Sequence, residues 1–457
     1  MLRSTPLMRW TICLATSLLY LSFSCSTAVH GAGKSPNIVF ILADDLGREC
    51  LESYGGTSYR TPNLNRLAEQ GTRFECCYAT PMCSPTRVML MTGRYSFHNY
   101  RQWGRMDLEQ PTLASVLQHS GYHTAVSGKW HLGGWDQPPY GPTRTGFGRY
   151  ATFDYEKVVR EGGQVGNQFW NTEIWKNGQN YRLNMEYGPA WYRRQALDFI
   201  REHAARNSPA FFLYYPLVHA HRPFVPTDHV AASAKERTTR NGKLKYFPAM
   251  VSYIDEIVGT VLDTLETTGQ LENTVIFFAA DNGTDNVGEA KELRSQYRGT
   301  KVAGGKYLPT ELGANVPLLV RGPGVRQGRV VKLPVDFTDM LPTLCEIAET
   351  QCPSATDGES LWPMLQGAPE TGHDGRAYTW GVFEHSSKKY KTPATYQNEL
   401  IHVVRDGRWK LLSTGELFDL ADDWQEQTPL PNGAERASRM RLRNHLDQLR
   451  SSASKLW

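Results

Sequence analysis

The stretch PNIVFILADDLG (residues 36–47) contains a continuous apolar run that ends in two aspartates and, after Leu46, a glycine. An apolar run that stops at carboxylates is typical of a parallel strand buried on both faces, with polar side chains at its carboxyl end. We therefore expect a buried strand over residues 38–43, with Asp44 and Asp45 at its edge. Helix capping by aspartate is the alternative explanation of this pair.

The stretch NTVIFFAADNGTDN (residues 273–286) repeats this pattern far along the chain. Its apolar run over residues 275–280 stops at Asp281, Asn282 and Gly283. Asp-Asn-Gly is also a common turn sequence. Two such endings in one chain favour two buried strands that present their polar ends at one edge of a sheet.

Helix and strand patterns alternate around these runs. We expect a helix between Thr61 and Gly71, a helix ending at Gly121, a strand over 122–127, a buried strand within 208–221 and a long helix closed by Gly269. Alternating strands and helices predict an α/β core with helices on both faces of the sheet. Near residue 370 the pattern changes, and Asp406-Gly407 is a hairpin signal between two strand-like runs. We therefore predict a main domain over 32–370 and a small C-terminal α+β subdomain over 371–457.

The composition describes a globular protein. Of the 457 residues, 40% are hydrophobic, and the formal net charge is only +4 with no basic block. This balance gives no reason to expect a nucleic-acid partner.

The N-terminus has the layout of a signal peptide. Arg3 and Arg9 precede an apolar run over residues 10–23, which is short for a membrane span and suits a signal-peptide core. We expect a signal peptide over residues 1–31 and an exported protein, periplasmic or secreted, without a stable membrane span. An uncleaved anchor and a lipid attached at Cys25 are the less favoured alternatives.

Export changes how the cysteines are interpreted. Cys345 and Cys352 are candidates for a local disulfide in an oxidising compartment. Cys83, in TPMCSPTRVMLMTG (residues 80–93), follows Cys76 and Cys77 closely. Taken alone, Cys83 fits a disulfide partner, a reactive or metal-binding thiolate, or a cysteine that is modified.

Polar residues at the expected strand ends form two chemical sets. Hard oxygen ligands, which suit Ca²⁺ or Mg²⁺ and not zinc, come from Asp44, Asp45, Asp281 and Asn282. Cationic and imidazole groups, which suit an anion, come from Arg87, Lys129, His131, His221 and Lys306. A divalent cation flanked by such groups can bind and polarise a sulfate or phosphate ester.

These motifs resemble those of the type I, formylglycine-dependent sulfatases, which are arylsulfatase-like members of the alkaline-phosphatase superfamily. Residues 83–87 match the family signature Cys-x-Pro-[Ser/Ala]-Arg except at Thr86. Further similar stretches follow in the family's order: GKWHLG (128–133), YYPLVHAHRPFVPT (214–227), FFAADNGTDN (277–286), DFTDMLPTL (336–344) and VRDGRWKLL (404–412). The resemblance implies a large, mixed, mostly parallel central sheet between helices, and a smaller C-terminal antiparallel sheet plus a helix.

The resemblance also implies a role for each site residue. A formylglycine-generating maturation enzyme would convert Cys83 to 3-oxoalanine (formylglycine), whose hydrate attacks sulfur with one hydroxyl and expels sulfate with the help of the other. A Ca²⁺ ion, or Mg²⁺, would be held by residue 83 together with Asp44, Asp45, Asp281 and Asn282. Arg87 would orient the nucleophile, Lys129 and Lys306 would bind sulfate oxygens, His131 would act as the base and His221 as the acid. His219 and Lys301 are the nearest rivals of His221 and Lys306.

The expected function is hydrolysis of a sulfate ester of an alcohol or sugar. Aromatic, Arg and Lys residues in the loops 98–107, 133–146 and 383–399 favour a sulfated glycan as substrate. Two alternatives stay open: a phosphonate monoester or phosphodiester hydrolase of the same superfamily, and an unmatured glycan-binding protein without catalysis.

Overall fold

Strand β1 (Asn37–Ala43) lies in the interior of a large sheet, and every residue of the strand is buried. The computed structural model describes Met1 and residues 35–155, 157–158, 167–206, 208–370, 376–381 and 400–453. The expected signal peptide and the loop 383–399 lie outside the described residues. Residues Ser35–Trp457 form one compact unit.

The main sheet has eleven strands in the order β14-β2-β13-β10-β1-β9-β5-β6-β7-β8, with β15 beside β2. Its strands are β1, β2 (Thr72–Tyr78), β5 (His123–Lys129), β6 (Arg149–Phe153), β7 (Glu173–Lys176), β8 (Gln179–Arg182), β9 (Phe211–Pro216), β10 (Thr274–Ala280), β13 (Asn315–Arg321), β14 (Arg329–Val331) and β15 (Val335–Asp336). The consecutive pairs from β10 through β1, β9 and β5 to β6 are parallel, whereas β13, β7 and β8 pair antiparallel with their neighbours. The mixed, mostly parallel sheet that the sequence predicts is confirmed.

The register of the two central strands brings their acidic ends together. In the parallel pair β1–β10, Ala43 is opposite Ala280, so Asp44 and Asp281 follow at the same edge. The amide of Asp281 donates to the carbonyl of Ala43 at 3.0 Å, which continues the pairing beyond the strands. This edge is where parallel α/β sheets usually bind ligands.

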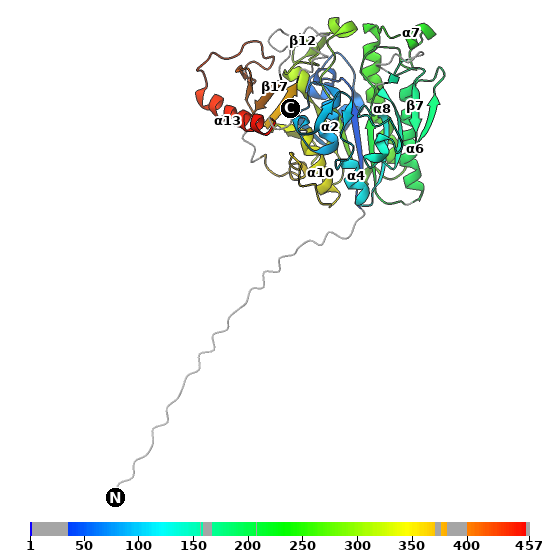
Figure 1. Cartoon of the computed structure of the whole chain (residues 1–457), viewed down its shortest axis with the longest axis horizontal. Coiled ribbons are helices and arrows are strands. Elements are labelled where there is room, and N and C mark those ends of the chain that lie inside the picture. Colours follow the sequence, from blue (N-terminus) through cyan, green and yellow to red (C-terminus); the bar gives the residue numbers. More distant parts are fainter. Residues whose placement is uncertain are drawn as a thin grey trace. The chain divides into compact units, whose positions relative to one another are not determined.

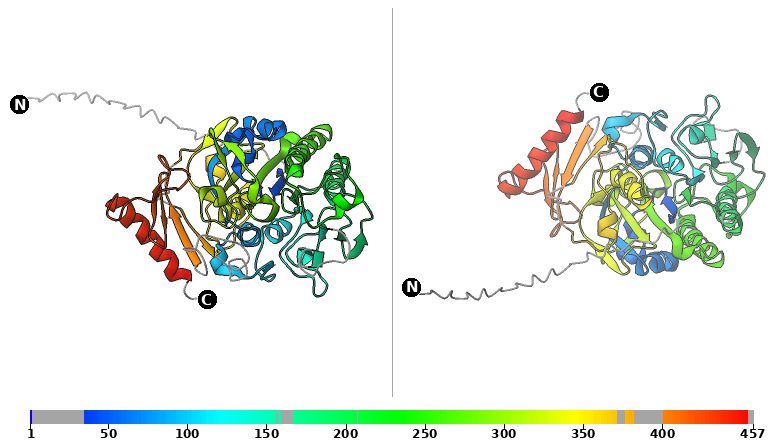
Figure 2. Two further views of the ribbon diagram at one scale, coloured as in Figure 1. Left: turned by 90° about the horizontal axis from the view of Figure 1, so that it is seen from above. Right: turned by 90° about the horizontal axis from the view of Figure 1, so that it is seen from below.

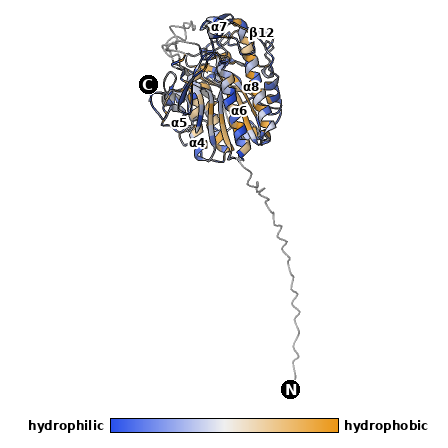
Figure 3. Ribbon diagram, turned by 90° about the vertical axis from the view of Figure 1, so that its right-hand side faces the viewer, coloured by the Kyte–Doolittle hydropathy of each residue, from blue (hydrophilic) through white to orange (hydrophobic). Residues whose placement is uncertain are grey.

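Helices cover both faces of the sheet (Figure 1). The helices are α1 (Pro62–Glu69), α2 (Cys83–Thr92), α3 (Ser96–Asn99), α4 (Leu113–His119), α5 (Gly141–Arg144), α6 (Gly188–Arg206), α7 (Ala234–Thr238), α8 (Phe247–Thr267), α9 (Glu311–Ala314), α10 (Met340–Ile347), α11 (Trp362–Leu365) and α13 (Arg436–Ala453). Helices α1 and α6 pack on α8, and α2, α4 and α10 contact one another. Apolar and polar residues separate onto different faces of α6 and α8, as Figure 3 shows, because one face of each helix is buried.

Three further sheets are small. Strands β3 (Tyr100–Gln102) and β4 (Arg105–Met106) form one pair, and β11 (Ser295–Tyr297) and β12 (Thr300–Val302) form another. The antiparallel C-terminal sheet contains β16 (Arg376–Gly381), β17 (Leu400–Arg405), β18 (Trp409–Leu412) and β19 (Leu417–Asp419), and α13 packs on it (Figure 2). The predicted hairpin at Asp406-Gly407 joins β17 to β18. The domain boundary at residue 370 stays a prediction.

Two sequence expectations differ from the structure in their bounds. Helix α4 ends at His119, two residues before Gly121. Strand β5 extends to Lys129, beyond the expected strand over 122–127. Gly128 makes this extension possible, because its φ is +125° and a Cβ there would lie 1.9 Å from the carbonyl oxygen of Pro216. The glycine thus lets β5 carry Lys129 to the edge of the sheet.

Candidate active site

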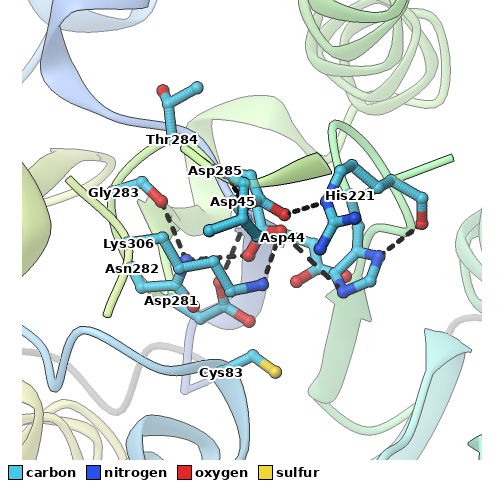
Figure 4. Close-up of polar contacts among 12 residues, drawn as sticks. Asp44, Asp45, Cys83, His221, Asp281, Asn282, Gly283, Thr284, Asp285 and Lys306 are labelled. Atoms are coloured by element: carbon cyan, nitrogen blue, oxygen red, sulfur yellow. Dashed lines mark hydrogen bonds and ion pairs between the residues drawn. The ribbon is translucent and has the colours of Figure 1, made fainter. Parts of the chain in front are cut away.

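Cys83 is the first residue of α2, a helix whose residues are all buried. Its sulfur and carboxylate oxygens of Asp44 and Asp281 all lie within 4.8 Å of one another. Strand β1, strand β10 and helix α2 therefore meet at one point, which Figure 4 shows in close-up. An anion is favoured here, because the free backbone amides of a helix N-terminus carry partial positive charge.

Three buried ion pairs surround this point. Arg87 donates from Nη2 and Nε to Asp281 Oδ2 at 2.7 and 3.0 Å. Lys129 Nζ lies 2.5 Å from Asp44 Oδ2, and Lys306 Nζ lies 2.6 Å from Asp45 Oδ2. Each cation thus has its own carboxylate, which offsets the cost of burying the charges.

Arg87 is held from two sides. Its Nη1 donates to the carbonyl oxygen of Lys129 at 3.0 Å, in addition to the pair with Asp281. The side chain is completely buried, and the charges of Asp281 and Asp44 raise the pKa of its guanidinium despite the opposing effect of burial. Arg87 is therefore a fixed positive charge one helical turn after Cys83 in α2.

His131 faces Cys83. Its Nδ1 lies 3.5 Å from the sulfur, and its Nε2 is buried without a hydrogen-bond partner among the described residues. Burial lowers the pKa of His131 well below its usual value, and the positive charge of Lys129 lowers it further. Both effects favour the neutral imidazole, in which one ring nitrogen carries no proton.

His221 lies beside Asp45, whereas the side chain of His219 points away from the carboxylates. His221 Nε2 is 3.8 Å from Asp45 Oδ2, and its Nδ1 is 2.6 Å from the carbonyl oxygen of Arg222. His219 is buried among aromatic rings, where its Nε2 contacts the Tyr187 hydroxyl at 2.5 Å and burial lowers its pKa to about 3. Of the two histidines, only His221 points toward the carboxylates.

The two candidate lysines, Lys306 and Lys301, differ in their burial and position. Lys306 is 1% exposed and reaches Asp45, whereas Lys301 lies exposed on β12. Asp45 raises the pKa of Lys306 well above its usual value, although burial opposes the rise. Lys306 is thus the lysine that belongs to this cluster.

The oxygens of the site fit a hard divalent cation. Asp44 Oδ1 and Asn282 Oδ1 are buried and have no hydrogen-bond partner among the described residues. Burial raises the pKa of Asp44 to about 8, with Asp281 and Asp45 adding to the rise and Lys129 opposing it. Unpartnered buried oxygens and crowded carboxylates are costly, and Ca²⁺ or Mg²⁺ bound to them would remove that cost.

Two residues of the cluster adopt a strained backbone conformation. Asp45 has φ +58° and His131 has φ +51°, a left-handed region that non-glycine residues rarely occupy. The amide of Asp45 donates to Asp281 Oδ1 at 3.2 Å, and Asn282 Nδ2 donates to Asp45 Oδ1 at 2.8 Å. Such strain is concentrated at functional sites, where it aims side chains inward.

Thr86 departs from the usual signature but makes hydrogen bonds that explain a hydroxyl there. Its Oγ1 accepts from the Thr80 amide at 3.0 Å and lies 3.1 Å from the carbonyl oxygens of Thr80 and Met82. These bonds tie the loop before Cys83 to the first turn of α2. A serine hydroxyl could make the same contacts.

Sequence reasoning missed two side chains in this cluster. The ring of Tyr155 stacks on His131, and Gln168 Nε2 lies 3.0 Å from His221 Nδ1. Tyr155 follows the end of β6, so the strand-end pattern that identified the aspartates was available for it as well. Gln168 lies in a loop and offered no comparable signal.

Five other cysteines lie in the described part of the chain. Cys50, Cys76, Cys77, Cys345 and Cys352 are free thiols in the structure. The disulfide that the sequence suggests between Cys345 and Cys352 is therefore not formed in it. Among the described residues, no helix has the length and hydropathy that a membrane crossing requires.

Two family models match the chain. One, described as Sulfatase, matches residues 36–350, and the other, described as N-sulphoglucosamine sulphohydrolase, C-terminal, matches residues 306–452. N-acetylgalactosamine-6-sulfatase of Rattus norvegicus is 31% identical over 374 residues, which cover 74% of this chain and 67% of that protein. Arylsulfatase A of Homo sapiens is 30% identical over 422 residues, which cover 86% of this chain and 77% of that protein.

Solved structures share the fold. A protein in complex with its substrate D-glucosamine-2-N,6-O-disulfate has a TM-score of 0.71 at 20% identity, covering 92% of this chain and 99% of that one. The phosphonate monoester hydrolase of Agrobacterium radiobacter has a TM-score of 0.65 at 21% identity, covering 92% and 96%. The fold alone therefore fits both activities, but the sequence matches are specific: the chain belongs to the sulfatase family and is an arylsulfatase-like sulfatase of the alkaline-phosphatase superfamily.

Proposed function

We propose that the enzyme removes sulfate from a sulfated saccharide with a formylglycine made from Cys83 and a Ca²⁺ ion, for which Mg²⁺ is the alternative. The observation that carries the proposal is that the Cys83 sulfur and carboxylate oxygens of Asp44 and Asp281 gather within 4.8 Å. The ion would be held by residue 83, Asp44, Asp45, Asp281 and Asn282. Buried oxygens of Asp44 and Asn282 that have no hydrogen-bond partner among the described residues support this ligand set.

The group formed at residue 83 would supply a hydroxyl nucleophile for sulfur, and the bound cation would lower the pKa of that hydroxyl and polarise the sulfate. In this structure the Cys83 sulfur stands in for the hydroxyl oxygen. Arg87 lies one helical turn further along α2, where its bonds to Asp281 and to the Lys129 carbonyl hold it fixed. It would orient the nucleophile through its fixed charge.

Lys129 and Lys306 would bind the sulfate from two sides. Their ammonium groups reach Asp44 and Asp45, the neighbouring carboxylates at the end of β1. Negative charge grows on the sulfate and the leaving oxygen in the transition state, and fixed cations in a buried site stabilise it strongly. Both lysines are almost completely buried, so water screens their charge little.

Each of the two histidines would transfer one proton in the reaction. His131 Nδ1, 3.5 Å from the Cys83 sulfur, would take the proton from residue 83 when sulfate is expelled. His221 Nδ1 lies 2.6 Å from the Arg222 carbonyl oxygen, so the acid form needs a second proton on Nε2 for the leaving alcohol. Burial lowers the pKa of His221, and the Asp45 carboxylate, 3.8 Å from Nε2, opposes that shift and would favour this second proton. General acid and base groups in such positions contribute on the order of 10²–10⁴-fold each.

A saccharide substrate is supported by the names of relatives. Those names include N-acetylgalactosamine-6-sulfatase, and one structural neighbour is in complex with a disulfated glucosamine.

Cys83 is only 1% exposed in the folded chain. A formylglycine-generating enzyme would therefore act before folding is complete. We also propose that the chain is exported.

The test is sulfate release from defined sulfated saccharides and turnover of an aryl sulfate beside an aryl phosphodiester. We expect faster turnover of the sulfate, and loss of activity with EGTA in excess Mg²⁺ that added Ca²⁺ restores. Faster turnover of the phosphodiester would favour the phosphonate and phosphodiester hydrolases instead. If the enzyme keeps its activity in EGTA and also in EDTA, it does not need the proposed divalent cation.

A further inference from the structure

The ring of Tyr155 contacts three of the candidate catalytic side chains. It stacks on the His131 imidazole with ring centroids 3.7 Å apart and planes inclined by 27°. The Lys129 Nζ lies over the same ring, 4.7 Å from its centroid. The His221 ring meets it edge-on at 6.2 Å. One aromatic side chain therefore links the base, one sulfate-binding lysine and the acid of the proposed mechanism.

The main sheet sets the position of Tyr155. Strands β5 and β6 are parallel, and Lys129 is opposite Phe153 at their ends. Two residues further along each chain segment come His131 and Tyr155. Their stacking thus continues the strand pairing beyond the edge of the sheet. The Tyr155 side chain is only 6% exposed, so its position is set by packing inside the protein.

Packing, more than hydrogen bonding, orients His131. Its Nε2 has no hydrogen-bond partner among the described residues, and its Nδ1 has only the contact with the Cys83 sulfur. Aromatic side chains flank the imidazole: Tyr155 covers a face, and Trp103 meets it at 5.3 Å with an angle of 71°. Removing the Tyr155 ring would leave the imidazole free to turn away from residue 83.

The ring also acts on Lys129. An ammonium group over an aromatic face is attracted by the negative charge of that face, more strongly when water is excluded. Tyr155 is 6% exposed and Lys129 is completely buried, so the contact is nearly dry. The ring and Asp44 hold the ammonium from two directions, and this limits where it can meet a sulfate oxygen.

We propose that Tyr155 is a positioning residue of this sulfatase: its ring face holds the His131 imidazole toward residue 83 and the Lys129 ammonium toward the sulfate. The inference rests on the proposed function, because it assigns Tyr155 to the same reaction. The phenol hydroxyl has no part in it, so a phenylalanine must suffice.

The test compares Tyr155→Leu with Tyr155→Phe, using Tyr192→Leu as a matched control. Tyr192 is a buried tyrosine whose ring is tilted by 31° against that of Phe153 at 6.3 Å, and no contact joins it to His131 or Lys129 among the described residues. Tyr155→Leu should lower kcat on an aryl sulfate about 10²-fold, as expected for a misplaced catalytic group, and change KM less than about threefold. Tyr155→Phe and Tyr192→Leu should keep kcat within about threefold of the wild type. Equal loss in the Phe and Leu variants, or little loss in the Leu variant, overturns the proposal.

A second measurement does not depend on activity. A crystal structure of Tyr155→Leu in the unmatured Cys83 form should show the His131 ring turned away, with the contact between its Nδ1 and the Cys83 sulfur lost. An unchanged His131 ring overturns the positioning role, even if the wild type releases no sulfate and the proposed function fails. If Tyr155→Leu does not fold, ring-fluorinated phenylalanines at position 155 keep the shape and weaken the charge of the ring face. Kcat should then fall with each added fluorine relative to Tyr155→Phe, and an unchanged kcat overturns the proposal.

Discussion

Lys129 Nζ lies 2.5 Å from Asp44 Oδ2, and both side chains are completely buried. The pair joins the end of β5 to the end of β1, across the intervening strand β9. It therefore connects a proposed metal ligand to a proposed sulfate-binding group. Replacing either side chain should therefore affect both metal binding and sulfate binding.

Lys129→Met should lower kcat/KM for an aryl sulfate by about 10²–10³-fold, because it removes a buried charge from the transition state. Lys301→Met is the matched control, since Lys301 lies exposed on β12 and should leave turnover unchanged. Circular dichroism should show that both variants fold. Activity of Lys129→Met within about threefold of the wild type would contradict its role.

Thr86→Val should destabilise the protein by about 1–3 kcal/mol, because the Thr80 amide loses its buried acceptor. Thr86→Ser keeps a hydroxyl and should change neither stability nor the conversion of Cys83. Urea unfolding gives the first quantity and peptide mass the second. Reduced conversion in wild type relative to Thr86→Ser would show that threonine itself limits maturation.

Lys410→Met should destabilise the C-terminal sheet. Lys410 Nζ lies 2.6 Å from Glu426 Oε1 and 3.5 Å from Glu311 Oε1, and Lys410 is completely buried. Removing one partner leaves buried carboxylates uncompensated, which typically costs about 3–5 kcal/mol. A loss below about 1 kcal/mol in urea unfolding would mean that Arg405, 3.4 Å from Glu311, compensates alone.

His203 makes stability depend on pH. Burial lowers its pKa, and nearby His123 and Arg149 lower it further, while the Phe199 carbonyl and Glu202 oppose the shift. The unfolded chain, with a histidine pKa near about 6.5, therefore binds protons more readily than the folded chain. The stabilisation is complete above that pH and is lost as the pH falls through the folded pKa. Between about pH 7.5 and 5, Tm should thus fall more for wild type than for His203→Phe; equal slopes would contradict this assignment.

The sequence predicts the site well where the side chains lie at strand ends. Asp44 and Asp281 follow apolar runs, and the parallel register of β1 and β10 then brings them together. Tyr155 also follows the end of a strand, but the sequence does not indicate its contact with His131, which depends on the register of β5 against β6. That register is a property of the folded sheet and not of either segment.

The charged cluster at the C-terminal sheet illustrates the same limit. Glu311, Arg405 and Lys410 look like ordinary surface residues in the sequence, yet each is at most 5% exposed. Their pairing arises only when the C-terminal hairpin packs beside Tyr78 at the end of β2. Hydropathy patterns cannot identify such ion pairs, because they treat every charge as a surface feature.

The mass of the peptide that contains Cys83, taken from catalytically active protein of the native host, shows directly whether residue 83 is formylglycine. We expect the mass that results when the sulfur and two hydrogens of Cys83 are replaced by one oxygen. Sulfate release should scale with the fraction converted, and Cys83→Ala should release none. Protein that releases sulfate at full rate while Cys83 remains an unmodified thiol would contradict the formylglycine mechanism.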